Sequence, residues 1–265
     1  MEGLEWVIEQ ASAANLGKIP WLAPHFVNGE GEAVLSIHAL VIETRDRRIL
    51  VDTCVGNDKN LPVIADWHQR TGPFLADLAD AGYPRESVDT VLCTHLHVDH
   101  VGWNTMRVDG KWQPTFAEAR YLVAHDEWAH WSEKTDEFTT QVLDESVRPV
   151  WDAGLVDLVD ANHRVCDEVW LEPTPGHTPG HVSVRVSSRG EDAVITGDMI
   201  HHPCQIAEPG WGAQVDHDFD QGVRTRSDFL ARYGDQPVLV IGTHFAGPSA
   251  GRIVRDAGTY RLDVG

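Results

Sequence analysis

The stretch "CTHLHVDHVGW", residues 93–103, sets His95, His97, Asp99 and His100 directly behind the apolar run "VDTVLC". Burying several polar groups together is costly unless a partner compensates for them. His95 and His97 are two residues apart, so at the exit of a strand their side chains point the same way. Asp99 and His100 then begin a new element and face a second direction. Neutral imidazoles and carboxylates bind divalent metal ions, so the pattern predicts a metal site rather than a solvated loop.

Three later segments repeat this arrangement of a strand followed by a potential ligand. "PTPGHTPGH" holds His177 in a loop framed by proline and glycine, "ITGD" ends an apolar strand in Asp198, and "IGTHF" ends another in His244. Taken singly, such residues are common after strands and indicate little. Their ordered recurrence after His-x-His-x-Asp-His predicts that all of them serve one site.

The ordered set resembles the signature of the metallo-β-lactamase superfamily, which is His-x-His-x-Asp-His, then a distant histidine, an aspartate and a last histidine. "VDT" at 51–53 is similar to an early segment of that family, with Cys54 where glycine usually follows. The resemblance covers residues 33–250. It implies an α/β fold of the αββα four-layer sandwich type, formed as a single domain over residues 1–265.

The same resemblance implies two divalent metal ions. The first would be bound by His95, His97 and His177, and the second by Asp99, His100 and His244, with Asp198 bridging. Two such ions, about 3.5–4 Å apart, can share a hydroxide that attacks an ester carbonyl. A ligand set of nitrogen and oxygen alone suits zinc, with manganese, iron or cobalt as alternatives. The cysteine ligand of many antibiotic-degrading members is missing, which disfavours lactam hydrolysis.

Within the superfamily, "AGYPRESVDTVLCTHLHVDHVGW" (81–103) resembles the branch of N-acyl-homoserine lactonases and methyl parathion hydrolases. This implies a dinuclear hydrolase for a small apolar lactone or ester, such as a quorum-quenching lactonase. An organophosphate triester hydrolase of the methyl parathion hydrolase type is the alternative. Two other classes stay open, an iron-dependent oxidoreductase and a non-catalytic protein that binds a small ligand. The metal content separates them, since one iron per chain would favour the redox class.

Two catalytic residues are expected, Asp99 as ligand and proton carrier, and His201. His201 is the third residue after Asp198, where many such lactonases carry a tyrosine that binds the substrate carbonyl, so it would orient or polarise the substrate. The next residue, His202, is a weaker candidate. Asp52 either orients a ligand imidazole or only caps a strand end. Aromatic residues on loops that frame the metal edge in the relatives predict an apolar wall for the substrate: Trp21, Phe26, Trp67, Trp103 and Trp211.

The composition limits the partners. The formal net charge of −20 repels nucleic-acid phosphates and anionic membranes, so a small-molecule substrate is expected. No signal peptide and no apolar run of about 18–20 residues is present, which predicts a cytoplasmic protein. The four cysteines form no Cys-x-x-Cys pair and are expected to be free thiols. The resemblance also allows a homodimer.

Periodicity and turn residues predict the secondary structure. Hairpins are expected at 33–44 with 49–53, at 106–116, and at 181–188 with 192–198. Helices are expected at 71–83, within 126–150 and at 219–234, and further strands at 87–95, 119–125 and 237–244. This order suggests one sheet in each half of the chain, with helices outside.

Overall fold

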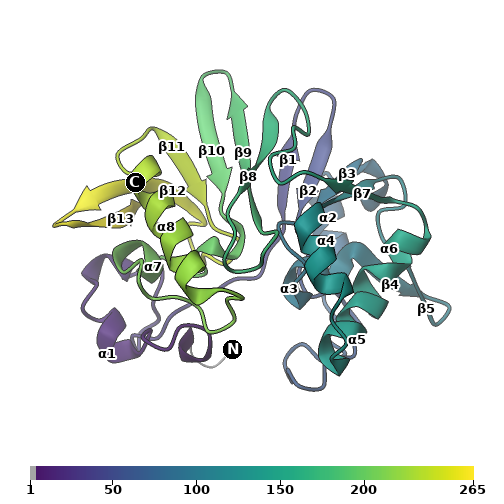
Figure 1. The fold of residues 1–265 in the computed structure, drawn as a ribbon, viewed down its shortest axis with the longest axis horizontal. Helices are drawn as coiled ribbons and strands as arrows, with labels where there is room; N and C mark the ends of the chain where they lie inside the picture. Colours follow the sequence, from purple (N-terminus) through teal and green to yellow (C-terminus); the bar gives the residue numbers. More distant parts are fainter. Residues whose placement is uncertain (1–3) are drawn as a thin grey trace. The chain divides into compact units, whose positions relative to one another are not determined.

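The computed structural model describes residues 4–265, which divide into two compact units (Figure 1). The central unit is Ile37–Asp160. The terminal unit joins the described residues up to Ser36 with Ala161–Gly265. Each unit has its own sheet and its own apolar core, as one sheet per half predicts. The single domain over residues 1–265 stays a prediction, and its first three residues lie outside the described range.

The sheet of the central unit has the order β1-β2-β3-β6-β7. Its strands are β1 Leu40–Glu43, β2 Arg48–Val51, β3 Thr90–Leu92, β6 Arg120–Ala124 and β7 Val156–Val159. β1 pairs with β2 antiparallel, and the other neighbours are parallel. β3 is buried along its whole length, because a parallel strand is covered on both faces.

Helices and one hairpin complete the central unit. They are α2 Phe74–Asp80, α3 Val98–Val101, α4 His125–Ser132, α5 Glu137–Ser146 and α6 Arg148–Asp152, the 3-10 turns η3 Arg85–Ser87 and η4 Gly102–Asn104, and the hairpin of β4 Thr105–Val108 with β5 Lys111–Pro114. Asp109 and Gly110 turn this hairpin with φ of 50° and 77°, as a tight hairpin requires. Asp136 begins α5 by accepting a hydrogen bond from the Thr139 amide. α4 packs on β6 and β7.

The sheet of the terminal unit has the order β13-β12-β11-β10-β9-β8. Its strands are β8 Val169–Pro173, β9 Val182–Ser188, β10 Glu191–Ile195, β11 Val238–Ile241, β12 Ala250–Asp256 and β13 Thr259–Asp263. Only β10 and β11 pair in parallel; every other neighbouring pair among these strands is antiparallel.

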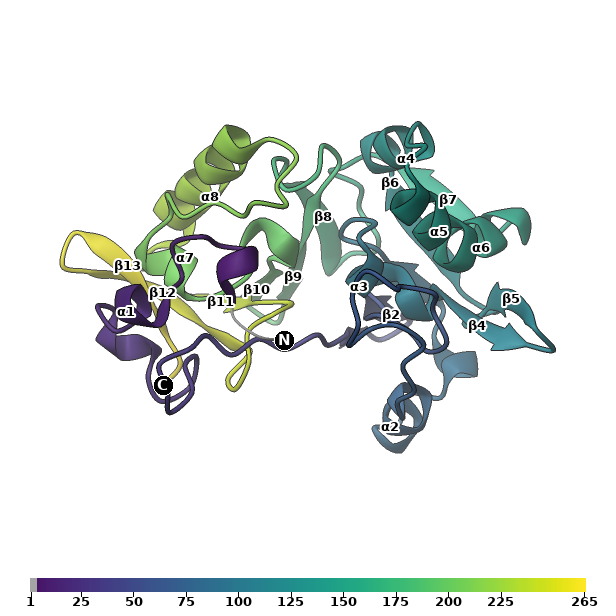
Figure 2. The ribbon, with the colours of Figure 1, turned by 90° about the horizontal axis from the view of Figure 1, so that it is seen from below.

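The helices of the terminal unit are α1 Ala13–Leu16, α7 Cys204–Ala207 and α8 Phe219–Tyr233, with the 3-10 turns η1 Leu4–Trp6, η2 Pro20–Leu22 and η5 Gly197–Met199. Figure 2 shows α8 lying along the sheet of its own unit. α8 buries Phe229 and Leu230 in a core that also contains Val194 and Val240 from the sheet. Asp218 caps the start of α8 by accepting a hydrogen bond from the Gln221 amide.

The predicted helices and hairpins are confirmed in type, and 126–150 holds three helices instead of one. The predicted strand at 33–44 is wrong in its first part. Regular pairing begins only at Leu40, and the preceding segment makes isolated bridges from Ala33 and Leu35. β7, β8, β12 and β13 were not predicted. No helix within residues 4–265 is long and apolar enough to cross a membrane.

Candidate metal ligands

In both units, predicted ligands, and in the central unit also the predicted supporting residue Asp52, follow neighbouring parallel strands. Asp52 and His95 lie beyond β2 and β3 of the central unit, and Asp198 and His244 lie beyond β10 and β11 of the terminal unit. The carboxyl ends of parallel neighbours meet at one edge of a sheet, which is where sites on α/β folds gather. His177 lies in the loop between β8 and β9.

The central unit brings together the four residues of the His-x-His-x-Asp-His motif. His95 Nε2 lies 3.0 Å from His97 Nδ1, and the rings of His95 and His100 have centroids 4.1 Å apart. His100 Nε2 lies 3.8 Å from Asp99 Oδ1. His97 and Asp99 flank the start of α3, so the change of direction expected after His97 is the turn into this short helix.

Asp52 and Thr94 hold two of these imidazoles. Asp52 Oδ2 lies 2.9 Å from His100 Nδ1, and its two oxygens also accept hydrogen bonds from the Thr94 amide and hydroxyl, each at 2.8 Å. The Thr94 hydroxyl in turn lies 3.0 Å from His95 Nδ1. Asp52 therefore contacts a predicted ligand directly, and its contacts with Thr94 at the end of β3 also fit the strand-capping alternative.

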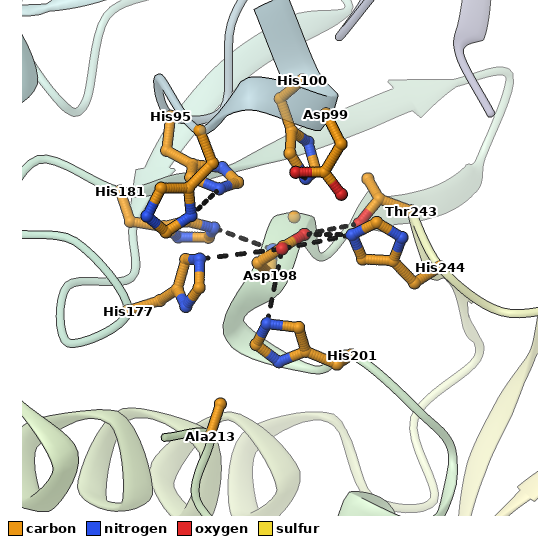
Figure 3. Close-up of polar contacts among 12 residues, drawn as sticks. His95, Asp99, His100, His177, His181, Asp198, His201, Ala213, Thr243 and His244 are labelled. Carbon is orange, nitrogen blue, oxygen red and sulfur yellow. Dashed lines mark hydrogen bonds and ion pairs between the residues drawn. The ribbon is translucent and has the colours of Figure 1, made fainter. Parts of the chain in front are cut away.

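The terminal unit gathers its predicted ligands around Asp198 (Figure 3). Asp198 Oδ2 lies 3.6 Å from His177 Nε2 and 3.4 Å from His201 Nε2. His244 Nε2 lies 3.2 Å from the same carboxylate, which also accepts a 3.1 Å hydrogen bond from the Thr243 hydroxyl.

The far side of the His177 ring and of the His244 ring is bound to an oxygen. His177 Nδ1 donates to Asp216 Oδ1 at 2.9 Å, and His244 Nδ1 donates to the Ser36 carbonyl, also at 2.9 Å. In the central unit, Asp52 and Thr94 occupy the corresponding nitrogens. A metal-binding histidine is fixed in this way, because an acceptor at one nitrogen leaves the lone pair on the other. The donor set of both units therefore fits a divalent metal ion.

His201 and His202 lie side by side in sequence but have different surroundings. His201 is buried beside Asp198, and neither of its ring nitrogens makes a hydrogen bond within residues 4–265. Burial lowers the pKa of His201 well below its usual value, opposed by the charge of Asp198. His202 donates to the Phe26 carbonyl at 2.8 Å and accepts from the Cys204 amide, and burial lowers its pKa to about 4. His202 is therefore a core residue that ties the loop to the N-terminal segment.

The predicted aromatic residues divide into two groups. Phe26, Trp67 and Trp103 are buried in the cores, at 1%, 6% and 8% exposure. Trp103 stacks on Phe74 with centroids 5.4 Å apart, which accounts for its burial. Trp21 and Trp211 are only partly buried against the core of the terminal unit. Contact of any of the five with substrate stays a prediction.

Comparison with known proteins decides the family. A family model described as the metallo-β-lactamase superfamily matches residues 33–245. The chain belongs to the metallo-β-lactamase superfamily. This membership, with the likeness to solved structures, confirms the predicted α/β fold class, and it implies a metal-binding hydrolase family.

Individual relatives of this superfamily are distant. A probable metallo-hydrolase of Mycobacterium tuberculosis is 26% identical over 196 residues, which are 66% of this chain and 60% of the relative. An N-acyl homoserine lactonase of a Bacillus species is 24% identical over 176 residues, covering 61% of this chain and 62% of the relative. The chain thus spans about 60% of the length of these curated relatives. The solved structure of AidC, a dizinc quorum-quenching lactonase with bound product, is similar with a TM-score of 0.78 at 22% identity, covering 98% of this chain and 89% of AidC.

Apart from Asp52, sequence reasoning missed the residues that contact the predicted ligands. Asp216 carries no motif, and its contact with His177 joins residues 39 positions apart. His181 accepts a 2.9 Å hydrogen bond from the Asp198 amide. The sequence "TPGH" occurs twice in this loop, ending once in His177 and once in His181, and this repeat is a signal that could have indicated His181. Thr94 is the second residue after β3, and its hydroxyl next to His95 could have been noted.

All four cysteines are free, as predicted. Burial raises the pKa of Cys54 and of Cys93 to about 12, so both thiols stay protonated at neutral pH. A protonated thiol is a poor nucleophile. We therefore do not expect Cys54 or Cys93 to act as a nucleophile.

Proposed function

We propose that this chain is a dinuclear metal-dependent hydrolase that opens the ester bond of a small apolar lactone or ester. The observation that carries the proposal is the set of four histidines with Nδ1 held by oxygen. These are His95 and His100 in the central unit, and His177 and His244 in the terminal unit. Histidines fixed in this way are typical of metal ligands.

The family motif assigns the ligands of two ions, with zinc preferred for a set of nitrogen and oxygen donors. His95, His97 and His177 would hold one ion, Asp99, His100 and His244 the other, and Asp198 both. When bound, the ions would supply an activated water and polarise the scissile carbonyl.

The chain's own residues would supply positioning and proton transfer. Asp99 is the candidate proton carrier, because a carboxylate can pass a proton to the leaving alkoxide. His201 lies beside Asp198 as a neutral ring, since burial lowers its pKa, and a neutral imidazole can donate one hydrogen bond to a substrate oxygen. Trp21 and Trp211, both only partly buried, are the candidates for contact with an apolar substituent.

The lactone or ester class is favoured by the names of the relatives. The Bacillus relative is an N-acyl homoserine lactonase, and AidC is a lactonase with a product N-acyl-homoserine bound. A small-molecule substrate also agrees with the net charge of −20, which disfavours nucleic acid.

A hydrolysis screen of zinc-loaded protein tests the proposal. It compares homoserine lactones of varied acyl length, aryl esters, a paraoxon-like triester and a cephalosporin, with metal content measured on the same sample. Two zinc ions per chain and turnover of lactones or esters are expected. Turnover of the triester alone would move the substrate to the phosphotriester class. One iron per chain without any hydrolysis would refute the hydrolase.

A further inference from the structure

The loop that carries His177 is fixed from one side by α8 and by the turn before it. The His217 amide donates to the His177 carbonyl at 2.9 Å, and the Thr225 hydroxyl donates to the Pro175 carbonyl at 2.6 Å. A Cβ on Gly176 would lie 2.4 Å from the backbone nitrogen of Gly222, so the two backbones touch. The His177 main chain is therefore placed by residues well outside the family motif.

Asp216 extends this contact to the imidazole itself. Its Oδ1 accepts from His177 Nδ1 at 2.9 Å, and its Oδ2 accepts from the Ala213 amide, also at 2.9 Å. Its side chain is 1% exposed, so water does not replace either partner. An ionised carboxylate has no proton to donate, so Asp216 can only accept at both oxygens, and His177 Nδ1 must then supply the N–H.

Arg226 of α8 lies behind the carboxylate and is also buried. Its Nη2 lies 4.0 Å from Asp216 Oδ2. Its other nitrogens donate to the Met199 and Pro209 carbonyls, each at 2.9 Å. Met199 directly follows Asp198, so one guanidinium fixes both the support of His177 and the segment after Asp198. A planar fork of donors can do this, whereas a lysine amine cannot make the same set of bonds.

We propose that Asp216 and Arg226 are positioning residues that hold His177 in the tautomer with the proton on Nδ1 and its Nε2 lone pair directed at a metal ion. This inference rests on the proposed metal centre. Because Asp216 accepts at both oxygens, an asparagine in its place can satisfy only one partner. If its amide turns to His177, the imidazole must accept there and move its proton to Nε2, which blocks metal binding.

The test uses the whole chain and the variant Asp216→Asn, with Asp218→Ala as the matched control. Asp218 caps α8 two residues later and accepts from the Gln221 amide, so its loss weakens the helix without touching His177. Nitrogen-15 NMR of the metal-free proteins reads the tautomer of His177, assigned with a His177→Gln variant. Competition with a zinc chelator reads metal affinity.

We expect the Nδ1–H tautomer in the wild type and in Asp218→Ala, and a shift towards Nε2–H in Asp216→Asn. Zinc affinity should fall about 10- to 100-fold in Asp216→Asn, as is typical when such a partner is removed. The zinc affinity of Arg226→Lys should lie between that of the wild type and that of Asp216→Asn. An Nε2–H tautomer in the wild type would overturn the proposal, even if the variants fail to fold. Equal zinc affinity in Asp216→Asn and wild type would also overturn it. Absence of ester hydrolysis would refute the proposed function and leave the tautomer result standing.

Discussion

Lys59 is a buried amine in the central unit, and it makes stability depend on pH. Only 1% of it is exposed. Nζ donates to the Thr105 hydroxyl at 2.7 Å and to the Glu145 carbonyl at 3.0 Å, and it lies 3.8 Å from the centroid of the Trp112 ring. Burial lowers the pKa of Lys59 from 10.5 to about 7, against the raising effect of Glu145.

The sign follows from proton binding. Between pH 7 and 10.5, the unfolded chain holds a proton on this amine that the folded protein has mostly lost. Stability therefore rises with pH in this window, and the cost of charging the buried amine is fully present below pH 7. With 1.36 kcal/mol per unit of pKa, the wild type gains about 3.5 kcal/mol of unfolding free energy from Lys59 between pH 7 and pH 10.

Urea unfolding of the wild type and Lys59→Met at pH 7, 8, 9 and 10 measures this gain. Methionine matches the length of the lysine stem, and the Glu145 carbonyl keeps its hydrogen bond from Thr105. The difference in unfolding free energy between the two proteins should change by about 3.5 kcal/mol from pH 7 to pH 10. Taking this difference removes the contributions of titrating groups that both proteins share. Lys111→Met, at an exposed position of β5, is the matched control for the replacement of a lysine by methionine. A flat difference for Lys59→Met would refute the reasoning.

Three further changes test the fold and the site. Gly102→Ala would place a Cβ 1.9 Å from the Val55 carbonyl carbon, so urea unfolding should show that the unfolding free energy falls by about 3 kcal/mol or more. The control Gly210→Ala should leave the unfolding free energy unchanged, because its Cβ would have nothing within 4 Å. Asp99→Ala should lose metal and lower kcat about 100-fold or more, and full metal content with full turnover would show that Asp99 has neither role. Removal of metal by a chelator should stop hydrolysis, and added zinc should restore it. Iodoacetamide at pH 7 should leave hydrolysis unchanged, because the thiols of Cys54 and Cys93 stay protonated. Activity that persists in the metal-free protein would contradict the metal centre.

The elements with strong local signals could be predicted from sequence. The helix predicted at 219–234 is α8, Phe219–Tyr233, because an aspartate cap, an apolar face and a glycine stop agree. The apolar run "YLVA" at 121–124, within the strand predicted at 119–125, gave β6 in the same way. The C-terminal pair β12 and β13 was missed because both strands include arginines and aspartates, which weaken the apolar pattern of a strand. Such strands are specified by their neighbours in the sheet, which local sequence does not reveal.

The same division holds for the candidate site. The predicted ligands could be found because they follow strands or fill a short motif, and the structure groups them within each unit. Asp216 and Arg226 could not be found, because their roles depend on contacts that only the folded chain makes. Asp216, just before α8, contacts His177 39 positions earlier, and Arg226 of α8 lies behind Asp216. Phe26 was predicted to line the pocket from an early loop that it shares with Trp21. Its ring packs edge-to-face on Phe245 inside the core, and its contact with substrate stays a prediction.

The acceptor that holds His244 is the main-chain carbonyl of Ser36, whereas those that hold His100 and His177 are aspartate side chains. A peptide group persists whatever residue occupies its position. In a saturation-mutagenesis library, position 36 should therefore accept many residue types, while positions 52 and 216 should accept almost none. The two kinds of support therefore differ in how well they survive substitution of the supporting residue, although the acceptor lies 2.9 Å from Nδ1 in all three imidazoles.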